Sequence, residues 1–327
     1  MSTKKIIAIV GATGTQGSSV AHTFLDLPNW HVRALTRTPI SAQALADKGA
    51  EVIQADLNDP DSLSRAFKDV HAIFLNTDFW APFRAALASG IDHETACKIG
   101  YDTEVTNGRN AISAAAKVPT LERFIYSALG PMNRASGGKY PDSHHWETKA
   151  FLVDYLNDQE KELATKTSLI YIGAYLHNPF LYPKPQKETG GAYAMVIPAS
   201  KQMRMPIIDT AVSTGPFVRA LVEDEAPRTK LLAYDEYLTL EQIIEVWEKV
   251  TGKKAAFVQM GLQELHEMSG VPLEILYAPA FLDEFGYCGG VDGVIEPAQL
   301  KAKVNVKTFE ESISRLDMDF VLGLQGK

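Results

Sequence analysis

Cysteine is scarce in this sequence. The two cysteines, Cys97 and Cys288, are too few for a disulfide framework and fit a reducing compartment. Neither is accompanied by a His/Cys cluster at metal-ligand spacing, so we expect buried thiols and no metal site. No low-complexity segment or internal repeat is present, and 46% hydrophobic with 22% charged residues is the composition of a globular protein.

Positive charge in excess and long apolar runs are also missing. Forty acidic against thirty-two basic residues give a formal net charge of -8, which argues against nucleic acid as the main partner. No apolar run approaches the roughly 18–20 residues of a membrane span. We therefore expect a cytoplasmic protein that binds neither nucleic acid nor membrane.

Glycines follow the first apolar run in a regular pattern. Ile6–Val10 predicts a strand, and Gly11, Gly14 and Gly17 come directly after it, before a helical pattern. A tight turn, a close approach of the backbone to a ligand and close packing of helix on strand each favour glycine. The helix N-terminus would offer free N–H groups and the positive end of its dipole to phosphates. This context predicts a dinucleotide site.

Strand and helix patterns alternate through the first half of the chain. Such a rhythm predicts βαβ units, and hence a doubly wound parallel sheet of Rossmann type in the α/β class. We assign residues 1–172 to this dinucleotide-binding domain, with a return strand near residues 229–235. Strands are predicted at Trp30–Leu35, Glu51–Ala55, His71–Leu75, Phe124–Tyr126 and Ser168–Ile172, and helices at Ser19–Leu27, Ser41–Lys48, Pro60–Phe67, Asp92–Lys117 and His144–Ala164.

The second half, residues 173–327, is predicted to form a smaller, mostly helical domain that binds a substrate or a partner. Its first part, Tyr175–Met205, is rich in proline, glycine and aromatic residues and predicts loops and short strands over the cofactor. Capping boxes open helices at Thr239 and Thr308. Helices are expected at Thr214–Val222, Leu262–Ser269, Leu273–Glu284 and Phe309–Asp319.

The end of the second predicted strand indicates the type of cofactor. An acid there would bind the ribose 2′-hydroxyl of NAD, whereas an arginine accommodates the 2′-phosphate of NADP. The sequence has Arg37 at this point and no acid between Val32 and Pro39, which favours NADP. Asp56, after the third strand, is placed either to meet the adenine side or simply to form a turn before Pro60.

Residues with useful chemistry follow the fifth strand. His145 and Lys149 are four residues apart on one helix, so their side chains share a face. Ser127 lies at a strand end, where a hydroxyl can orient a substrate or merely form a turn. Phenols could also come from Tyr140, Tyr171 or Tyr175, although aromatic side chains more often serve packing.

Several motifs together resemble the NmrA-like branch of atypical short-chain dehydrogenase/reductases, related to isoflavone-reductase-like enzymes. They are G-A-T-G-T-Q-G-S, L-T-R-T-P, A-D-L-N-D-P, L-N-T-D and H-W-E-T-K, and L-T-L-E-Q-I-I-E-V-W-E-K-V-T-G-K-K near the end. In typical short-chain dehydrogenases the helix of Lys149 carries a tyrosine at the place of His145. That tyrosine is missing here, which puts ordinary carbonyl reduction in doubt without excluding hydride transfer.

The resemblance implies a role for particular residues. Lys149 would hold the ribose hydroxyls or act as a base, while His145 and Ser127 would complete the catalytic set. The cofactor-binding residues would be Gly11, Thr13, Gly14, Thr15, Gln16 and Gly17 at the pyrophosphate, Arg37 at the 2′-phosphate, Asp56 and Leu57 on the adenine side, and Asn76 and Thr77 on the nicotinamide ribose side.

Three functions are compatible with these residues. The first is an NADPH-dependent reductase acting on a C=N, C=C or C=O bond of a fairly large apolar or aromatic substrate, as in secondary metabolism. The second is a non-catalytic NADP(H) redox sensor that regulates a protein partner. The third is a cofactor-bound scaffold for a non-redox condensation or cyclisation. The fold alone does not choose among them.

Overall fold

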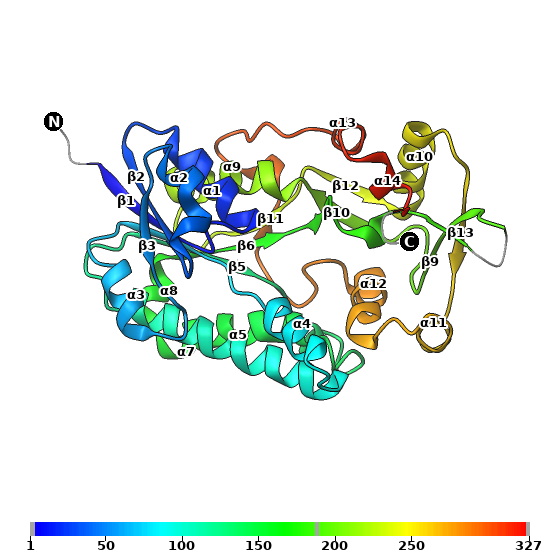
Figure 1. Ribbon diagram of the computed structural model, residues 1–327, viewed down its shortest axis with the longest axis horizontal. Coiled ribbons are helices and arrows are strands. Elements are labelled where there is room, and N and C mark those ends of the chain that lie inside the picture. Colours follow the sequence, from blue (N-terminus) through cyan, green and yellow to red (C-terminus); the bar gives the residue numbers. More distant parts are fainter. Residues whose placement is uncertain (1–3, 187–189, 325–327) are drawn as a thin grey trace.

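A parallel sheet of eight strands organises the chain (Figure 1). The computed structural model describes residues 4–186 and 190–324. The strand order is β14-β11-β6-β5-β4-β1-β2-β3, and every neighbouring pair runs parallel. The order reverses between β1 and β4, where ligands bind in open sheets of this kind. The strands are β1 (Lys5–Val10), β2 (Trp30–Thr36), β3 (Glu51–Gln54), β4 (Ala72–Leu75), β5 (Arg123–Ala128), β6 (Thr167–Ile172), β11 (Lys230–Ala233) and β14 (Val294–Ile295).

Helices cover both faces of this sheet, because strands in its middle are apolar on both sides. One face carries α1 (Thr15–Leu25), α2 (Gln43–Ala46) and α9 (Thr210–Glu223), and its core includes Phe24, Phe217 and Leu221. The other face carries α3 (Pro60–Ala66), α5 (His93–Ala116), α7 (His144–Gln159) and α8 (Lys161–Lys166). The predicted fold class is confirmed.

Two glycines bring α5 unusually close to its neighbours. A Cβ atom on Gly108 would lie 2.2 Å from the Leu152 side chain of α7, and one on Gly100 would lie 2.8 Å from Phe79. Only glycine fits at such distances. The consequence is that polar side chains of α5 and α7 can meet directly.

The C-terminal part combines helices with two three-stranded sheets, ordered β12-β10-β7 and β13-β9-β8. Short strands were expected within residues 175–205, but their pairing into sheets was not, because the strands are short and contain prolines such as Pro185 and Pro206. They consist of β7 (Ala174–Tyr175), β8 (Lys184–Pro185), β9 (Tyr193–Ile197), β10 (Arg204–Ile208), β12 (Glu236–Thr239) and β13 (Ala255–Gln259). The helices are α10 (Leu240–Thr251), α11 (Leu262–Ser269), α12 (Leu273–Phe285), α13 (Phe309–Ile313) and α14 (Met318–Val321).

Several predicted elements differ from the observed ones. The helix at residues 144–164 is two helices that meet at Glu160, where neither glycine nor proline signals the break. The helix at residues 309–319 is likewise divided into α13 and α14. Helix α4 (Trp80–Ala88) was not predicted. Both capping boxes are present, at Thr239 and Thr308.

The aromatic residues of the 175–205 stretch mostly serve packing. Tyr182 is buried and stacks on Phe309, and the Tyr193 ring lies against Trp247. Residues 187–189 of this stretch lie outside the described part of the chain. Within residues 4–186 and 190–324, no helix combines the length and the apolar character that a membrane crossing requires.

Candidate functional site

The glycine turn has the shape of a phosphate cradle. Gly11 has a φ of +70°, and its carbonyl accepts a hydrogen bond of 2.9 Å from the Gly14 N–H. A Cβ atom on Gly17 would lie 2.1 Å from the Gly11 carbonyl oxygen, so only glycine lets α1 begin this close to β1. Gly14 caps α1 without a side-chain acceptor, which leaves N–H groups of the first turn open to an anion.

Arg37 follows β2 immediately and is exposed. Among the residues that the structure describes, no carboxylate forms an ion pair with the Arg37 guanidinium. The backbone carbonyl of Arg37 accepts a hydrogen bond from the Gln54 side chain. Glu51, at the start of β3, lies opposite Arg33 and is held by Arg33 at 2.8 Å and by His31. Burial acts to raise the pKa of Glu51, but the interactions with Arg33 and His31 lower it below its usual value. A positive group is therefore available beside the turn.

Asp56 forms a turn. Its Oδ1 accepts hydrogen bonds from the backbone N–H of Asn58 at 2.9 Å and from that residue's side-chain amide. The backbone carbonyl of Leu57 accepts from Asn110 of α5. The turn interpretation of Asp56 thus has a direct structural basis, and its contact with adenine stays a prediction.

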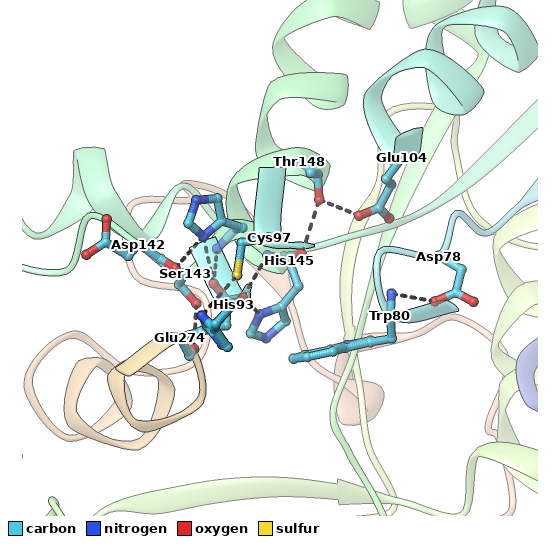
Figure 2. A network of polar contacts seen from close by, with 11 residues as sticks. Asp78, Trp80, His93, Cys97, Glu104, Asp142, Ser143, His145, Thr148 and Glu274 are labelled. Atoms are coloured by element: carbon cyan, nitrogen blue, oxygen red, sulfur yellow. Dashed lines mark hydrogen bonds and ion pairs between the residues drawn. The ribbon is translucent and has the colours of Figure 1, made fainter. Parts of the chain in front are cut away.

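Lys149 lies in a polar cluster at the carboxyl end of β4. Its Nζ donates to the carbonyl oxygen of Thr77 at 3.0 Å and to the Thr77 hydroxyl at 3.1 Å, and it forms an ion pair of 3.0 Å with Glu104. The Glu104 side chain is fully buried, and that of Lys149 is 13% exposed. Hydroxyls of Thr77 and Thr148 also donate to Glu104, at 2.6 and 2.5 Å. Figure 2 shows the contact of Thr148 with Glu104. The carboxylate therefore fixes the direction of the lysine.

Glu104 and Thr148 are site residues that the sequence reasoning missed. A usable signal exists for Glu104, because it is four residues from both Gly100 and Gly108 and so shares their face of α5. These glycines pack against neighbouring elements, which makes Glu104 an acid on a buried helix face. A buried acid of this kind needs a partner.

Ser127 does not join this cluster. It is buried in β5, and none of the polar contacts found among the described residues links it to Lys149. The adjacent Tyr126 contacts the cluster instead: its hydroxyl lies 3.3 Å from the Thr77 hydroxyl, and its ring lies 5.9 Å from the Lys149 Nζ. Burial and the Glu104 charge raise the pKa of Tyr126 well above its usual value, so this phenol is a poor acid at neutral pH.

Glu274 of α12 binds the start of α7. Its two carboxylate oxygens accept from the backbone N–H groups of His144 and His145, at 2.8 and 3.1 Å, and also contact Nδ1 of both imidazoles. Burial acts to raise the pKa of Glu274, yet the hydrogen bonds from the two histidines lower it to about 2. Bonding to Glu274 in turn raises the pKa of His144.

His145 is oriented by this carboxylate and by an aromatic wall. Its ring centroid lies 4.8 Å from that of Trp80, at the start of α4, and 6.1 Å from that of Phe79. Glu274 occupies Nδ1, and within the described residues no hydrogen bond reaches Nε2. The environment of His145 is thus dominated by an acid of the C-terminal part, which the sequence reasoning did not anticipate.

The three candidate tyrosines have different surroundings. Tyr175 of β7 reaches the glycine turn, where its hydroxyl accepts a hydrogen bond of 2.6 Å from the side-chain amide of the buried Gln16. Tyr140 donates to Glu284 of α12, and burial together with that contact raises its pKa to about 12. Tyr171 is buried within β6, and burial raises its pKa well above the usual value. Only Tyr175 lies against the predicted cofactor turn.

Comparison with known proteins decides the family. The sequence profile of the NmrA-like family matches residues 3–313. The chain belongs to the NmrA-like family. One relative, the NmrA-like family domain-containing oxidoreductase cpsB of Aspergillus campestris (strain IBT 28561), is 42% identical over 291 residues, which cover 82% of this chain and 79% of cpsB.

Solved structures of NmrA-like and reductase proteins share the fold. The negative transcriptional regulator NmrA in complex with NADP superposes with a TM-score of 0.66 at 20% identity, over 96% of both chains. The same regulator in complex with NAD gives 0.67 at 21% identity, also over 96% of both chains. Isoflavone reductase gives 0.67 at 18% identity, over 96% of this chain and 99% of its own.

The other residues expected from the NmrA-like resemblance lie near the carboxyl edge of the sheet. Thr13 and Thr15 are exposed in the glycine turn, and Asn76 is half-buried directly after β4. Thr77 is buried and bonded to both Lys149 and Glu104. Their contacts with a cofactor remain predictions.

Proposed function

We propose that this NmrA-like chain is an NADPH-dependent reductase that reduces a C=N, C=C or C=O bond of a fairly large apolar or aromatic small molecule. The observation that carries the proposal is the fixed cation Lys149, which a fully buried carboxylate orients at the sheet edge. A lysine used only for solubility would not be held by a buried acid, whose desolvation costs several kcal/mol.

The residues of the turn fit a dinucleotide. The space that a Cβ atom on Gly17 would fill is taken by the Gly11 backbone, so the turn keeps its N–H groups close together for an anion. Thr13, Gly14, Thr15 and Gln16 would surround the pyrophosphate, and Arg37 would bind the 2′-phosphate. When bound, NADPH supplies the hydride that a reduction requires.

Lys149 and Thr77 would hold the hydroxyls of the nicotinamide ribose. The ammonium is a donor and Thr77 is already bonded to it, so an arriving hydroxyl meets groups whose geometry is set in advance. Because Glu104 pairs with this lysine, we assign Lys149 to orientation and charge stabilisation rather than to the role of a base.

His145 would donate the proton that accompanies reduction. It lies one helical turn before Lys149 on α7, and Glu274 holds its Nδ1, which leaves Nε2 as the nitrogen able to exchange a proton with a substrate. Trp80 beside the ring would offer an apolar surface to an aromatic substrate. The relative cpsB, named an oxidoreductase, supports the proposal of a reductase as a whole.

A non-catalytic NADP(H) sensor is the second candidate. The observation that favours it is that Tyr126, whose ring lies 5.9 Å from the Lys149 Nζ, is buried and has a strongly raised pKa, so this phenol is poorly suited to proton transfer at neutral pH. The similarity in fold to the regulator NmrA fits this candidate as well.

Titration of the purified protein with NADPH, followed by a panel of imines, enones and quinones, separates the two. The reductase predicts loss of NADPH absorbance with at least one class of acceptor, and its disappearance in Lys149→Ala. Saturable NADPH binding with constant absorbance across the panel would instead support the sensor.

A further inference from the structure

A second group of chemically useful side chains lies where α5, α7 and α12 meet. Cys97 of α5, His144 of α7 and Glu274 of α12 each offer one ligand atom, and these atoms all lie within 4.8 Å of one another. Cys97 and Glu274 are buried, and His144 is half-buried. The three residues come from distant parts of the sequence, so only the fold brings them together. Figure 2 shows two of them, Cys97 and Glu274.

His93 contacts one member of this group, Cys97, and is the candidate for a fourth donor. It lies one helical turn before Cys97 on α5, and its Nδ1 is 3.7 Å from the Cys97 Sγ. In a tetrahedral zinc site with bonds of about 2.0–2.3 Å, neighbouring ligand atoms are roughly 3.3–3.8 Å apart. The spacing of 3.7 Å between Cys97 and His93 matches this range. The ligand atoms of Cys97, His144 and Glu274 all lie within 4.8 Å of one another and would reach it by side-chain movement.

We propose that Cys97, His144 and Glu274, with His93 as the fourth ligand, form a site for a zinc-class divalent cation that joins α12 to α5 and α7. One sulfur, two imidazole nitrogens and one carboxylate oxygen are the donor set that zinc and cobalt accept and that magnesium and calcium avoid. A thiolate and a carboxylate together balance the charge of a divalent ion. Binding transfers the Cys97 thiol proton to solvent and involves no change of oxidation state.

Neighbouring groups would orient these ligands. Nδ1 of His144 donates to the Asp142 carbonyl oxygen at 2.7 Å, which leaves Nε2 for the cation, and the second oxygen of Glu274 contacts His145. Such outer contacts fix the direction of metal ligands in proteins. Because Glu274 belongs to the C-terminal part, the cation would fasten that part to α5 and to α7, which carries Lys149.

Cobalt binding to the full-length protein tests the site. We expect one Co²⁺ per chain, with the intense visible bands of tetrahedral cobalt and a near-ultraviolet sulfur-to-cobalt charge-transfer band. In Cys97→Ser the charge-transfer band should disappear, whereas Cys288→Ser, which removes the only other thiol, should keep it. Cobalt bound without that band, no binding at all, or equal loss in both variants would overturn the proposal.

Zinc affinity gives a second test that does not depend on how Cys97→Ser folds. His93 is exposed, so His93→Ala should fold normally and should weaken Zn²⁺ binding by more than about tenfold in competition with a chromophoric chelator. Stoichiometric Zn²⁺ should also raise the unfolding temperature of the wild-type protein. Unchanged Zn²⁺ affinity in His93→Ala would overturn the assignment of the fourth ligand.

Discussion

Lys149 on α7 and Glu104 on α5 form an ion pair of 3.0 Å. The carboxylate is fully buried and also accepts hydrogen bonds from the hydroxyls of Thr77 and Thr148. Gly108 on α5, which packs against Leu152 of α7, lets the two helices approach closely enough for this contact. The pair links the packing of the helical layer directly to the candidate site, because the same lysine also bonds the loop after β4.

Removing the charge of Glu104 should therefore affect both stability and the site. We expect Glu104→Gln to lower the free energy of unfolding by up to about 3 kcal/mol, since it leaves Lys149 with no carboxylate. Urea unfolding measures this. Asp102→Asn is the matched control, because it breaks an exposed pair with Lys98 on the same helix and should cost less than about 1 kcal/mol. Equal costs in both variants would contradict a buried ion pair.

Arg37 should discriminate between the two nicotinamide cofactors. Loss of a charged contact to the 2′-phosphate costs about 1.5–3 kcal/mol, so Arg37→Ala should weaken NADPH binding roughly 10- to 150-fold and leave NADH nearly unchanged. Fluorescence titration with both cofactors gives the ratio. Arg65→Ala, an exposed arginine on α3, serves as the control. A parallel loss for both cofactors would show that Arg37 does not read the phosphate.

Much of the cofactor side could be predicted because its signals are local. The glycine turn, the strand before it and Arg37 after β2 are adjacent in sequence to the elements that position them. Glu104 and Glu274 could not be assigned from spacing, because each meets α7 only through the packing of helices distant in sequence. The break at Glu160 and the short proline-containing strands lack any periodic pattern.

Gly17 should not tolerate a side chain. A Cβ atom there would overlap the Gly11 backbone at 2.1 Å, so Gly17→Ala must displace α1 from β1. We expect the free energy of unfolding to fall by about 1–3 kcal/mol and NADPH binding to weaken. Gly261→Ala is a suitable control, since its nearest neighbour would be 3.7 Å away. Full NADPH affinity in Gly17→Ala would contradict the phosphate cradle.

Asp235 should make the native state sensitive to pH. Burial, with the charges of Asp209 and Glu236 adding to it, raises the pKa of Asp235 from 3.8 to about 6. Between these values the native state holds more protons than the unfolded state, so this group's contribution to stability falls as the pH rises from about 4 to 6.

Asp235→Asn removes this penalty. The variant should be more stable than the wild type at pH 7 by up to about 3 kcal/mol, and the difference should vanish below pH 4. Urea unfolding at a series of pH values measures it. A difference that does not change between pH 4 and 7 would mean that the carboxyl is not held in this environment.

Hydride transfer by a lysine-oriented cofactor is the central claim, and isotope transfer tests it most directly. The protein is incubated with NADPH deuterated at C4 of the nicotinamide, in both stereochemical forms, and with the panel of imines, enones and quinones. Mass spectrometry then measures deuterium in the products. We predict deuterium in the product from one of the two forms, and none with Lys149→Met. Saturable NADPH binding with no deuterium in any product would contradict the claim.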